Sequence, residues 1–354
     1  MIRLFVILLF VTFLAGCFSK QKLPDNPVEQ AQEERGDIRV MFYNVENLFD
    51  TFDDSLTDDS EFQPEGDRHW TPFKMQDKIK NIAKVITAVG GWDPPEIIGM
   101  CEIENRYVLE QLTDFSPIAD FGYKIIHYES PDGRGIDVAL LYLEKKFKPI
   151  HQQKIEISFP GSNERKTRDI LYVKGLVNNQ DTLHVFINHW PSRLGGQLES
   201  ESKRLFVASV LKAKTDSIFK SNPCSNIIIT GDFNDEPENK SLNDVLEAKR
   251  EYSEIKENNL YNISFSLQEK GLGSHKYQGI WGMLDQFVVS GCLLMKKEKG
   301  LNTSLENVHV FSRDYLMEPD EKNTGTMPKR TFVGFKYNQG FSDHLPVYLD
   351  LKLN

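Results

Sequence analysis

Short apolar segments recur along the chain from residue 38 onward, and this repetition constrains the fold more than any other feature of the sequence. The segments have the length of β-strands. Single helices are expected between them, at 74–89, where apolar residues recur at helical spacing before two glycines, and at 201–218. Because strands outnumber helices, the pattern predicts sheets packed face to face with helices outside. The strand order stays open.

The expected strands are spread evenly, without an internal repeat or a second linker, which indicates one domain. They lie at 38–43, 97–101, 123–128, 138–142, 171–176, 183–188, 227–230, 287–290, 308–311 and 347–351. Residues 50–70 are acidic and irregular, so we expect a surface loop there. Its acidic part at 50–59 should be a solvated face, although it could bind calcium.

Polar side chains gather at six of the strand ends. They are Asn44, Glu46, Glu102, Glu104, Asn188, His189, Asp232, Asn234, Asp235, Asp285, Asp343 and His344. One polar strand end is usually a solvated turn, but six are hard to dismiss, because converging strand ends form a rigid frame for a site.

This set has the composition of a magnesium-dependent phosphoryl site. Mg²⁺ prefers oxygen ligands, and Glu46 and Glu102 are the best ligand candidates, with Asn44 and Asp343 near them. A histidine beside a carboxylate can act as a general base or acid, because its pKa lies near neutrality. Neighbouring strand residues point to opposite faces, so we expect Asp285, not Asp343, to orient His344.

The motifs around these residues resemble those of the endonuclease/exonuclease/phosphatase superfamily over almost the whole length from Val40 to Val347. They are Asn44-Val45-Glu46-Asn47, Met100-Cys101-Glu102-Ile103-Glu104-Asn105, Arg134-Gly135-Ile136-Asp137-Val138-Ala139, His189-Trp190-Pro191-Ser192-Arg193, Gly231-Asp232-Phe233-Asn234-Asp235, Gly279-Ile280-Trp281-Gly282-Met283-Leu284-Asp285 and Ser342-Asp343-His344-Leu345-Pro346. The resemblance implies an α+β fold of the deoxyribonuclease I type. This fold is a four-layer α/β/β/α sandwich with the site at one end of the paired sheets.

The resemblance also implies a metal shell. Glu102 would be the main Mg²⁺ ligand, with Glu46 and Asp343 completing or supporting the shell, and Mn²⁺ or Ca²⁺ are alternatives. Asn44 and Asn234 would orient a phosphate oxygen or the attacking water. The number of metal ions stays open.

The remaining roles concern protons and phosphate. Asp232 would position or deprotonate the water, and His344 would act as base or bind phosphate, so the identity of the base is open. His189 would protonate the leaving oxygen as an imidazolium, although it could also be an ordinary core histidine. Arg134 offers a bidentate grip on phosphate, and Arg193 is a weaker candidate.

Other polar and aromatic residues are expected to support the site. Glu104 and Asp235 would hold ligands or cap turns, and Tyr277 and Trp281 would pack at the rim and not stack on bases. His275, Lys276 and Tyr277 are weaker candidates for lining a substrate groove.

The first residues predict a lipoprotein. Arg3 precedes an apolar run at 4–15, which is shorter than the roughly 20 residues that a membrane span needs. The run ends in Leu14-Ala15-Gly16-Cys17, which resembles a bacterial lipobox. We therefore expect a signal peptide at 1–16, lipid on Cys17, a polar tether over 17–36 and the domain at 37–354. The expected location is the cell envelope, either periplasmic or at the outer surface. An ordinary signal peptide or a buried helix is the alternative.

The other cysteines, Cys101, Cys224 and Cys292, lie far apart and show no zinc-binding spacing. Three cysteines cannot all pair within the chain, so we expect no essential disulfide, and Cys101 should be buried.

These observations predict a Mg²⁺-dependent phosphoesterase that hydrolyses a phosphodiester. Its net charge of −10 makes non-specific binding to nucleic acid less favourable but does not exclude a nuclease. Family frequency still favours an endonuclease-like enzyme. A phosphatase or phospholipase C-type hydrolase, acting on inositol phosphates, phospholipid head groups or small phosphoesters, is the alternative. A binding lipoprotein without activity is less favoured because the polar set is complete. We expect a monomer with a membrane anchor.

Overall fold

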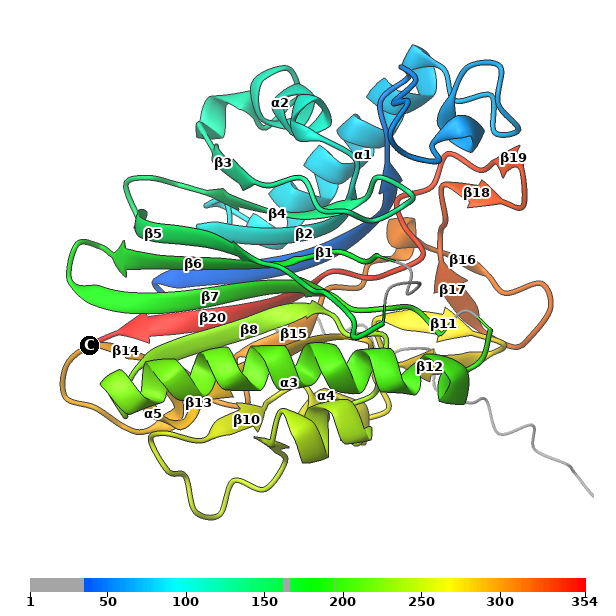
Figure 1. Ribbon diagram of the computed structural model, residues 1–354. Coiled ribbons are helices and arrows are strands. Elements are labelled where there is room, and N and C mark those ends of the chain that lie inside the picture. Colours follow the sequence, from blue (N-terminus) through cyan, green and yellow to red (C-terminus); the bar gives the residue numbers. More distant parts are fainter. Residues whose placement is uncertain (1–34, 162–165, 194) are drawn as a thin grey trace, which may run out of the picture.

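Two seven-stranded β-sheets stack face to face in the computed structural model, which describes residues 35–161, 166–193 and 195–354 (Figure 1). The first sheet has the order β14 (Leu301–Asn302), β20 (Val347–Leu353), β1 (Ile38–Leu48), β2 (Ile97–Ile103), β4 (Asp137–Tyr142) and β3 (Lys124–His127), with β15 (Val308–Val310) also paired to β20. The second has the order β5 (Phe147–Ile155), β6 (Ile170–Val177), β7 (Asp181–His189), β8 (Asn226–Asp232), β13 (Asp285–Ser290), β10 (Leu260–Asn262) and β9 (Ala248–Lys249). The expected signal peptide and Cys17 lie outside the described residues.

Helices cover the outer faces of both sheets. Helices α1 (Pro72–Gly90) and α2 (Arg106–Asp114) lie on the first sheet, and α3 (Gln197–Ser221) lies on the second (Figure 1). Two short helices, α4 (Phe265–Glu269) and α5 (Gly291–Leu294), complete the helical set. Three hydrophobic cores separate these four layers, one between the sheets and one under each helical layer. The α/β/β/α sandwich is therefore confirmed.

Three small hairpins lie outside the two sheets. They are β11 (His275–Tyr277) with β12 (Ile280–Gly282), β16 (Met317–Pro319) with β17 (Thr326–Pro328), and β18 (Phe332–Val333) with β19 (Lys336–Tyr337).

The strand register brings the polar strand ends to one edge. Strands β1 and β2 run parallel, as do β7 and β8, so their carboxyl ends coincide. His189 is opposite Asp232, which is in turn opposite Asp285 at the start of the antiparallel strand β13. The site residues of the second sheet thus lie side by side on three neighbouring strands.

The ten expected strands and the two expected helices are present, with differences at their ends, but helices α2, α4 and α5 were not expected. Helix α1 begins two residues early because Pro72 occupies its first turn and the Thr71 side chain accepts a hydrogen bond from the Lys74 backbone. Strand β1 continues past Asn44 to Leu48 through a local shift of register. Strand β5 was not expected because its side chains are mostly polar and exposed, as suits the edge of a sheet.

The sequence predicted no essential disulfide, but Cys224 and Cys292 are joined, with a Cα–Cα distance of 5.1 Å. Cys224 precedes β8 and Cys292 follows β13, and these two strands pair antiparallel, so residues 68 positions apart meet at one end of the sheet. Cys101 is free and buried, as expected.

Arg35, at the end of the segment expected to be a tether, contacts the domain. Its guanidinium donates to the Gly90 and Pro94 carbonyls and forms a 2.7 Å ion pair with Glu96. Nowhere in the described ranges is a helix both long enough and apolar enough to cross a membrane.

Candidate active site

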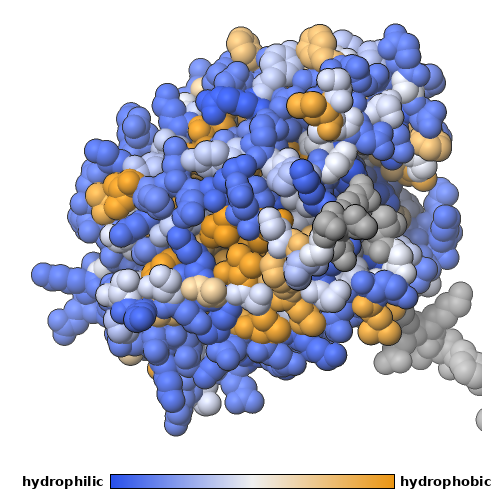
Figure 2. Space-filling view, viewed as in Figure 1, coloured by the Kyte–Doolittle hydropathy of each residue, from blue (hydrophilic) through white to orange (hydrophobic). Residues whose placement is uncertain are grey.

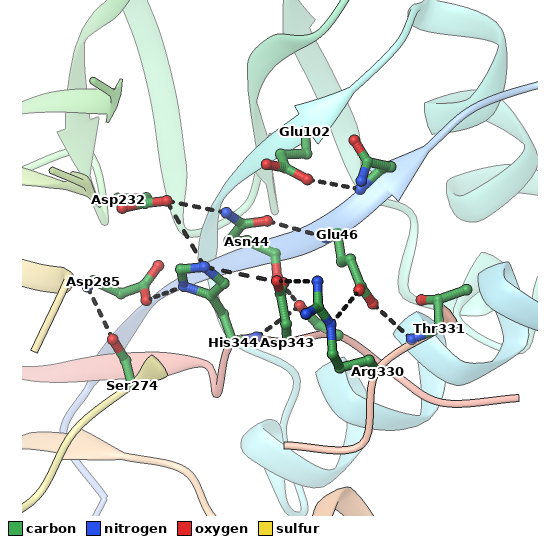
Figure 3. A network of polar contacts seen from close by, with 12 residues as sticks. Asn44, Glu46, Glu102, Asp232, Ser274, Asp285, Arg330, Thr331, Asp343 and His344 are labelled. Atoms are coloured by element: carbon green, nitrogen blue, oxygen red, sulfur yellow. Dashed lines mark hydrogen bonds and ion pairs between the residues drawn. The ribbon is translucent and has the colours of Figure 1, made fainter. Parts of the chain in front are cut away.

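The polar strand ends converge on one group of side chains (Figure 3). The group combines residues of β1, β2, β8 and β13 with those of the loop before β20. Its members in the figure include Asn44, Glu46, Glu102, Asp232, Asp285, Asp343 and His344.

His344 is held by Asp285. Nδ1 of His344 lies 2.6 Å from Oδ2 of Asp285, and Asp285 is fixed by a 3.0 Å hydrogen bond from its own backbone N–H to Ser274 Oγ. Burial lowers the pKa of His344, but the carboxylates of Asp285, Asp232 and Asp343 outweigh it and raise that pKa well above its usual value. Nε2 of His344 remains directed at Asp232 Oδ2, at 3.9 Å.

Asp232 lies at the centre of the group. Its Oδ2 accepts a 3.1 Å hydrogen bond from Asn44 Nδ2, and its Oδ1 accepts a 2.9 Å hydrogen bond from the Asn234 backbone N–H. Burial raises its pKa to about 7, helped by Asp285 and opposed by His344. A carboxyl with such a pKa can exchange a proton near neutral pH.

Glu102 and His189 face each other across the two sheets. One oxygen of Glu102 accepts a 2.9 Å hydrogen bond from the Asn47 backbone, and the other lies 3.9 Å from Nε2 of His189. Both Glu102 and Asn47 have positive φ, an uncommon conformation away from glycine, which turns the ends of β2 and β1 into the site. His189 Nε2 is also 3.7 Å from Asp232.

The surroundings of His189 favour its neutral form. Burial lowers its pKa well below the usual value, and the positive charges of Arg168 and Arg134 lower it further. The imidazolium that the sequence suggested would therefore need a nearby anion, such as a bound phosphate, to stabilise it.

Glu46 and Asp343 share an arginine that the sequence did not indicate. Arg330 Nε lies 3.1 Å from Glu46, and its Nη2 lies 2.9 Å from Asp343. Glu46 also accepts a 2.6 Å hydrogen bond from the Thr331 backbone, and the buried Lys78 ammonium is 4.0 Å away. Two of the expected metal ligands thus already have cationic partners.

The two candidate phosphate arginines differ in position. Arg134 is partly exposed and lies 3.8 Å from Asp132, and its positive charge lowers the pKa of His189. Arg193 donates at 2.8 Å to the Asn234 carbonyl and at 3.0 Å to Asn239. Arg193 therefore holds the loop of Asn234, whose side chain donates to the Trp190 carbonyl at 3.1 Å.

Other residues of the expected set lie around the group. The imidazole of His275 packs against that of His344 in a tilted arrangement, with ring centroids 4.6 Å apart, and Tyr277 on the same hairpin is exposed. Glu104 accepts a hydrogen bond from the Asp50 backbone, and Asp235 pairs with the buried Arg204 at 2.8 Å. Asp50 and Asp59 are buried, so the acidic loop is not entirely a solvated face.

The donor atoms suit a hard divalent cation. Within the described ranges, Glu102 Oε1 accepts no hydrogen bond, which leaves one carboxylate oxygen for an ion. Acidic and histidine side chains of Asp232, Asp285, His344, Asp343 and His275 lie close enough together to hold a metal in two overlapping groups. Glu102 belongs to neither group, so its free oxygen and these groups mark separate candidate positions for an ion.

Sequence reasoning missed Arg330, Lys78 and Ser274. Arg330 and Ser274 lie in loops, and Lys78 lies within helix α1, so none of them is at a polar strand end. For Lys78, the sequence does contain a signal, because this lysine lies on the apolar face of α1, between Met75 and Ile79, where a charged side chain needs a buried partner.

A sandwich with a carboxylate and histidine group at its strand ends defines a class of phosphoester hydrolases. A sequence profile of the Endonuclease/Exonuclease/phosphatase family matches residues 39–353, and the chain belongs to this family. No sequence among the curated proteins matches it.

Solved structures show the same fold. The mannosyl-6-phosphatase from Bacteroides thetaiotaomicron is 16% identical with a TM-score of 0.55, covering 89% of this chain and 99% of its own. The human nocturnin catalytic domain with bound sulfate is 16% identical with a TM-score of 0.53, covering 90% and 94%. An endonuclease/exonuclease/phosphatase family protein from Bacteroides thetaiotaomicron is 14% identical with a TM-score of 0.53, covering 89% and 97%.

Proposed function

We propose that the protein is a Mg²⁺-dependent phosphoesterase that hydrolyses a phosphodiester, with an endonuclease-like reaction favoured. The observation that carries the proposal is the His344–Asp285 pair directed at Asp232, beside a Glu102 oxygen that a cation could use. Phosphoryl transfer depends mainly on positioning and charge stabilisation, which this group supplies.

Glu102 would hold the Mg²⁺, with Asn44, Glu46 and Asp343 supporting it. The ion would supply charge stabilisation for the phosphate oxygens and a lower pKa for bound water. Arg330 contacts both Glu46 and Asp343. For these carboxylates to contact the ion, they would have to bind it together with the guanidinium or release the guanidinium.

Proton transfer falls to the remaining residues. Asp232 can accept a proton from water near neutral pH, and His344, kept cationic by Asp285, can donate to phosphate oxygens. Asn234 would orient the water or a phosphate oxygen, and Arg134 would bind the phosphate. The negative charge of a bound phosphate would raise the pKa of His189 and allow it to protonate the leaving oxygen.

A phosphatase of small phosphoesters is the second candidate. The solved mannosyl-6-phosphatase shares the fold, and the acidic net charge of −10 disfavours long polyanions. A phospholipid or inositol phosphate substrate belongs to the same group. A binding lipoprotein without activity is disfavoured because no residue of the polar set is replaced and its main members, Glu102, Asp232 and His344, lie together.

Hydrolysis by the purified full-length chain tests the proposal. Plasmid DNA, RNA, bis-p-nitrophenyl phosphate, sphingomyelin, inositol phosphates and mannose 6-phosphate would be compared with Mg²⁺, Mn²⁺, Ca²⁺ or EDTA. Turnover that requires a divalent cation and disappears in Glu102→Gln supports the reaction, and the preferred substrate chooses between the candidates. Absence of cation-dependent turnover across the panel contradicts it.

We also propose that the enzyme works as a monomer at the cell envelope, anchored through lipid on Cys17. The lipobox-like sequence supports this location, and the Cys224–Cys292 disulfide suits an oxidising compartment. Metabolic labelling with palmitate should mark the wild type and not Cys17→Ser. Equal labelling of the wild type and Cys17→Ser would contradict a lipid anchor on Cys17.

A further inference from the structure

A basic pocket with a volume of about 440 Å³ lies beside the candidate active site. Four cationic side chains line it, Arg134, Lys166, Arg168 and Lys203, against two acidic ones. We call this the basic pocket. Its size suits a phosphate together with part of the group that carries it.

The basic pocket shares a backbone carbonyl with the candidate active site. Arg168 Nη2 donates at 2.7 Å to the Trp190 carbonyl, which also accepts the hydrogen bond from Asn234. Trp190 directly follows His189 in the chain. A substrate with its reacting phosphate beside His189 could therefore extend into the pocket.

Among the described residues that line the pocket, two carboxylates accompany four cationic side chains. Asp132 contacts Arg168 at 3.1 Å and Arg134 at 3.8 Å, so one carboxylate serves two guanidinium groups. The second acidic residue, Glu199, is exposed. The described lining thus carries more cationic than acidic side chains, which suits an anion.

Buried donors in the wall are also without partners. Arg168 Nε and Thr167 Oγ1 form no hydrogen bond in the part of the chain that the structure describes, although both side chains are more than nine-tenths buried, with residue exposures of 7% and 4%. Buried polar atoms are usually satisfied, so such atoms mark a place where a ligand or water would bind. Both residues line the pocket.

One wall of the pocket is apolar. Phe159 belongs to the partly buried hydrophobic residues beside α3, and Lys203 lies 5.7 Å from the centre of its ring. On the face shown in Figure 2, apolar side chains gather along the line where α3 meets the second sheet. A sugar or base could pack against this wall while its phosphate meets the cations.

We propose that the basic pocket binds a second phosphate of the substrate, so that the enzyme prefers phosphoesters carrying two phosphates. The inference rests on the proposed function, because the first phosphate is the one hydrolysed. A nucleotide with a terminal phosphate and a sugar bisphosphate offer the same chemistry.

Matched substrates test the proposal with the full-length chain and Mg²⁺. The dinucleotide dTpT is compared with its 5′-phosphorylated form, and fructose 6-phosphate with fructose 1,6-bisphosphate. The test variant is Lys166→Gln/Lys203→Gln. The control is Lys80→Gln/Lys220→Gln, which removes the same charge at exposed positions; Lys220 lies about 25 Å along α3 from Lys203.

The wild type and the control should show a KM about tenfold lower for the doubly phosphorylated member of at least one pair, and the test variant should lose this preference. The test variant and the control should hydrolyse bis-p-nitrophenyl phosphate, which has a single phosphate, at the same rate. The substrate pair that shows the lower KM tells whether the second phosphate belongs to a nucleotide or to a sugar. A preference that is absent in the wild type, or kept in the test variant, overturns the proposal.

A failure of the proposed function would look different. If the wild type hydrolyses no phosphoester, the pocket is tested by calorimetric titration with thymidine 3′,5′-bisphosphate in EDTA. Weaker binding by the test variant than by the control supports the phosphate pocket without the enzyme activity. Equal binding overturns the pocket.

Discussion

Nδ1 of His344 lies 2.6 Å from Oδ2 of Asp285, although the two residues are 59 positions apart, with Asp285 at the start of β13 and His344 in the loop before β20. The contact fixes the orientation of the imidazole and leaves Nε2 facing Asp232. A carboxylate in this position also stabilises the cationic form of the ring.

Asp285→Asn should therefore lower kcat for bis-p-nitrophenyl phosphate by about 100-fold or more, because an amide neither stabilises the imidazolium nor fixes the same tautomer. Steady-state kinetics would measure this effect. Asp93→Asn, at an exposed position, serves as the control and should behave as wild type. A loss of less than about threefold would argue against a catalytic role for the pair.

Glu102→Gln should remove cation binding as well as activity. The substitution keeps the size of the side chain but removes its charge, so Mg²⁺ affinity measured by calorimetry should fall at least about tenfold. The exposed Glu298→Gln is the matched control. Unchanged Mg²⁺ affinity in Glu102→Gln would show that Glu102 is not a ligand of the ion.

Arg330→Gln should strengthen Mg²⁺ binding, because the guanidinium contacts both Glu46 and Asp343 and competes with an ion for their oxygens. We expect the dissociation constant to fall by about tenfold, corresponding to roughly 1.4 kcal/mol. Arg313→Gln, which removes an exposed guanidinium, is the comparison. Weaker binding would instead show that Arg330 organises the ligands.

Glu104→Gln should stabilise the protein at pH 8 and not at pH 4. Burial raises the pKa of Glu104 to about 8, with Asp50, Asp59 and Asp54 adding to the shift. The folded state therefore binds more protons than the unfolded state between about pH 4.5 and pH 8, so this group's contribution to stability is full below that window and is lost as the pH rises through it.

The glutamine can still accept the hydrogen bond from the Asp50 backbone, so the free energy of unfolding should rise by about 1 kcal/mol or more at pH 8. Urea unfolding at the two pH values measures the difference, with the exposed Glu144→Gln as control. A gain of equal size at pH 4 would refute the electrostatic cause.

The disulfide should contribute about 2 to 4 kcal/mol, because it closes a long loop in the unfolded chain. Dithiothreitol should lower the melting temperature of the wild type and leave that of Cys224→Ser/Cys292→Ser unchanged. A wild type insensitive to reductant would mean that the two cysteines do not pair in solution.

The sequence by itself determined most strands of the two large sheets, the two long helices and the polar strand ends. These features depend on local periodicity and on residue types that meet water or metal, and the order of the motifs indicated both the fold and the family. The pairing of His344 with Asp285 was also predicted, but the reason given for it does not hold, because Asp343 and His344 lie in the loop before β20 and not in a strand.

Only the tertiary structure decided which loop and helix residues reach the site. Arg330, Lys78 and Arg168 come from segments whose local pattern gives no sign of chemistry, and the strand register brought Cys224 beside Cys292. Arg193 contacts the Asn234 loop for the same reason. Such contacts depend on how distant segments pack, and a local sequence pattern carries no information about which distant side chain will fill a given place.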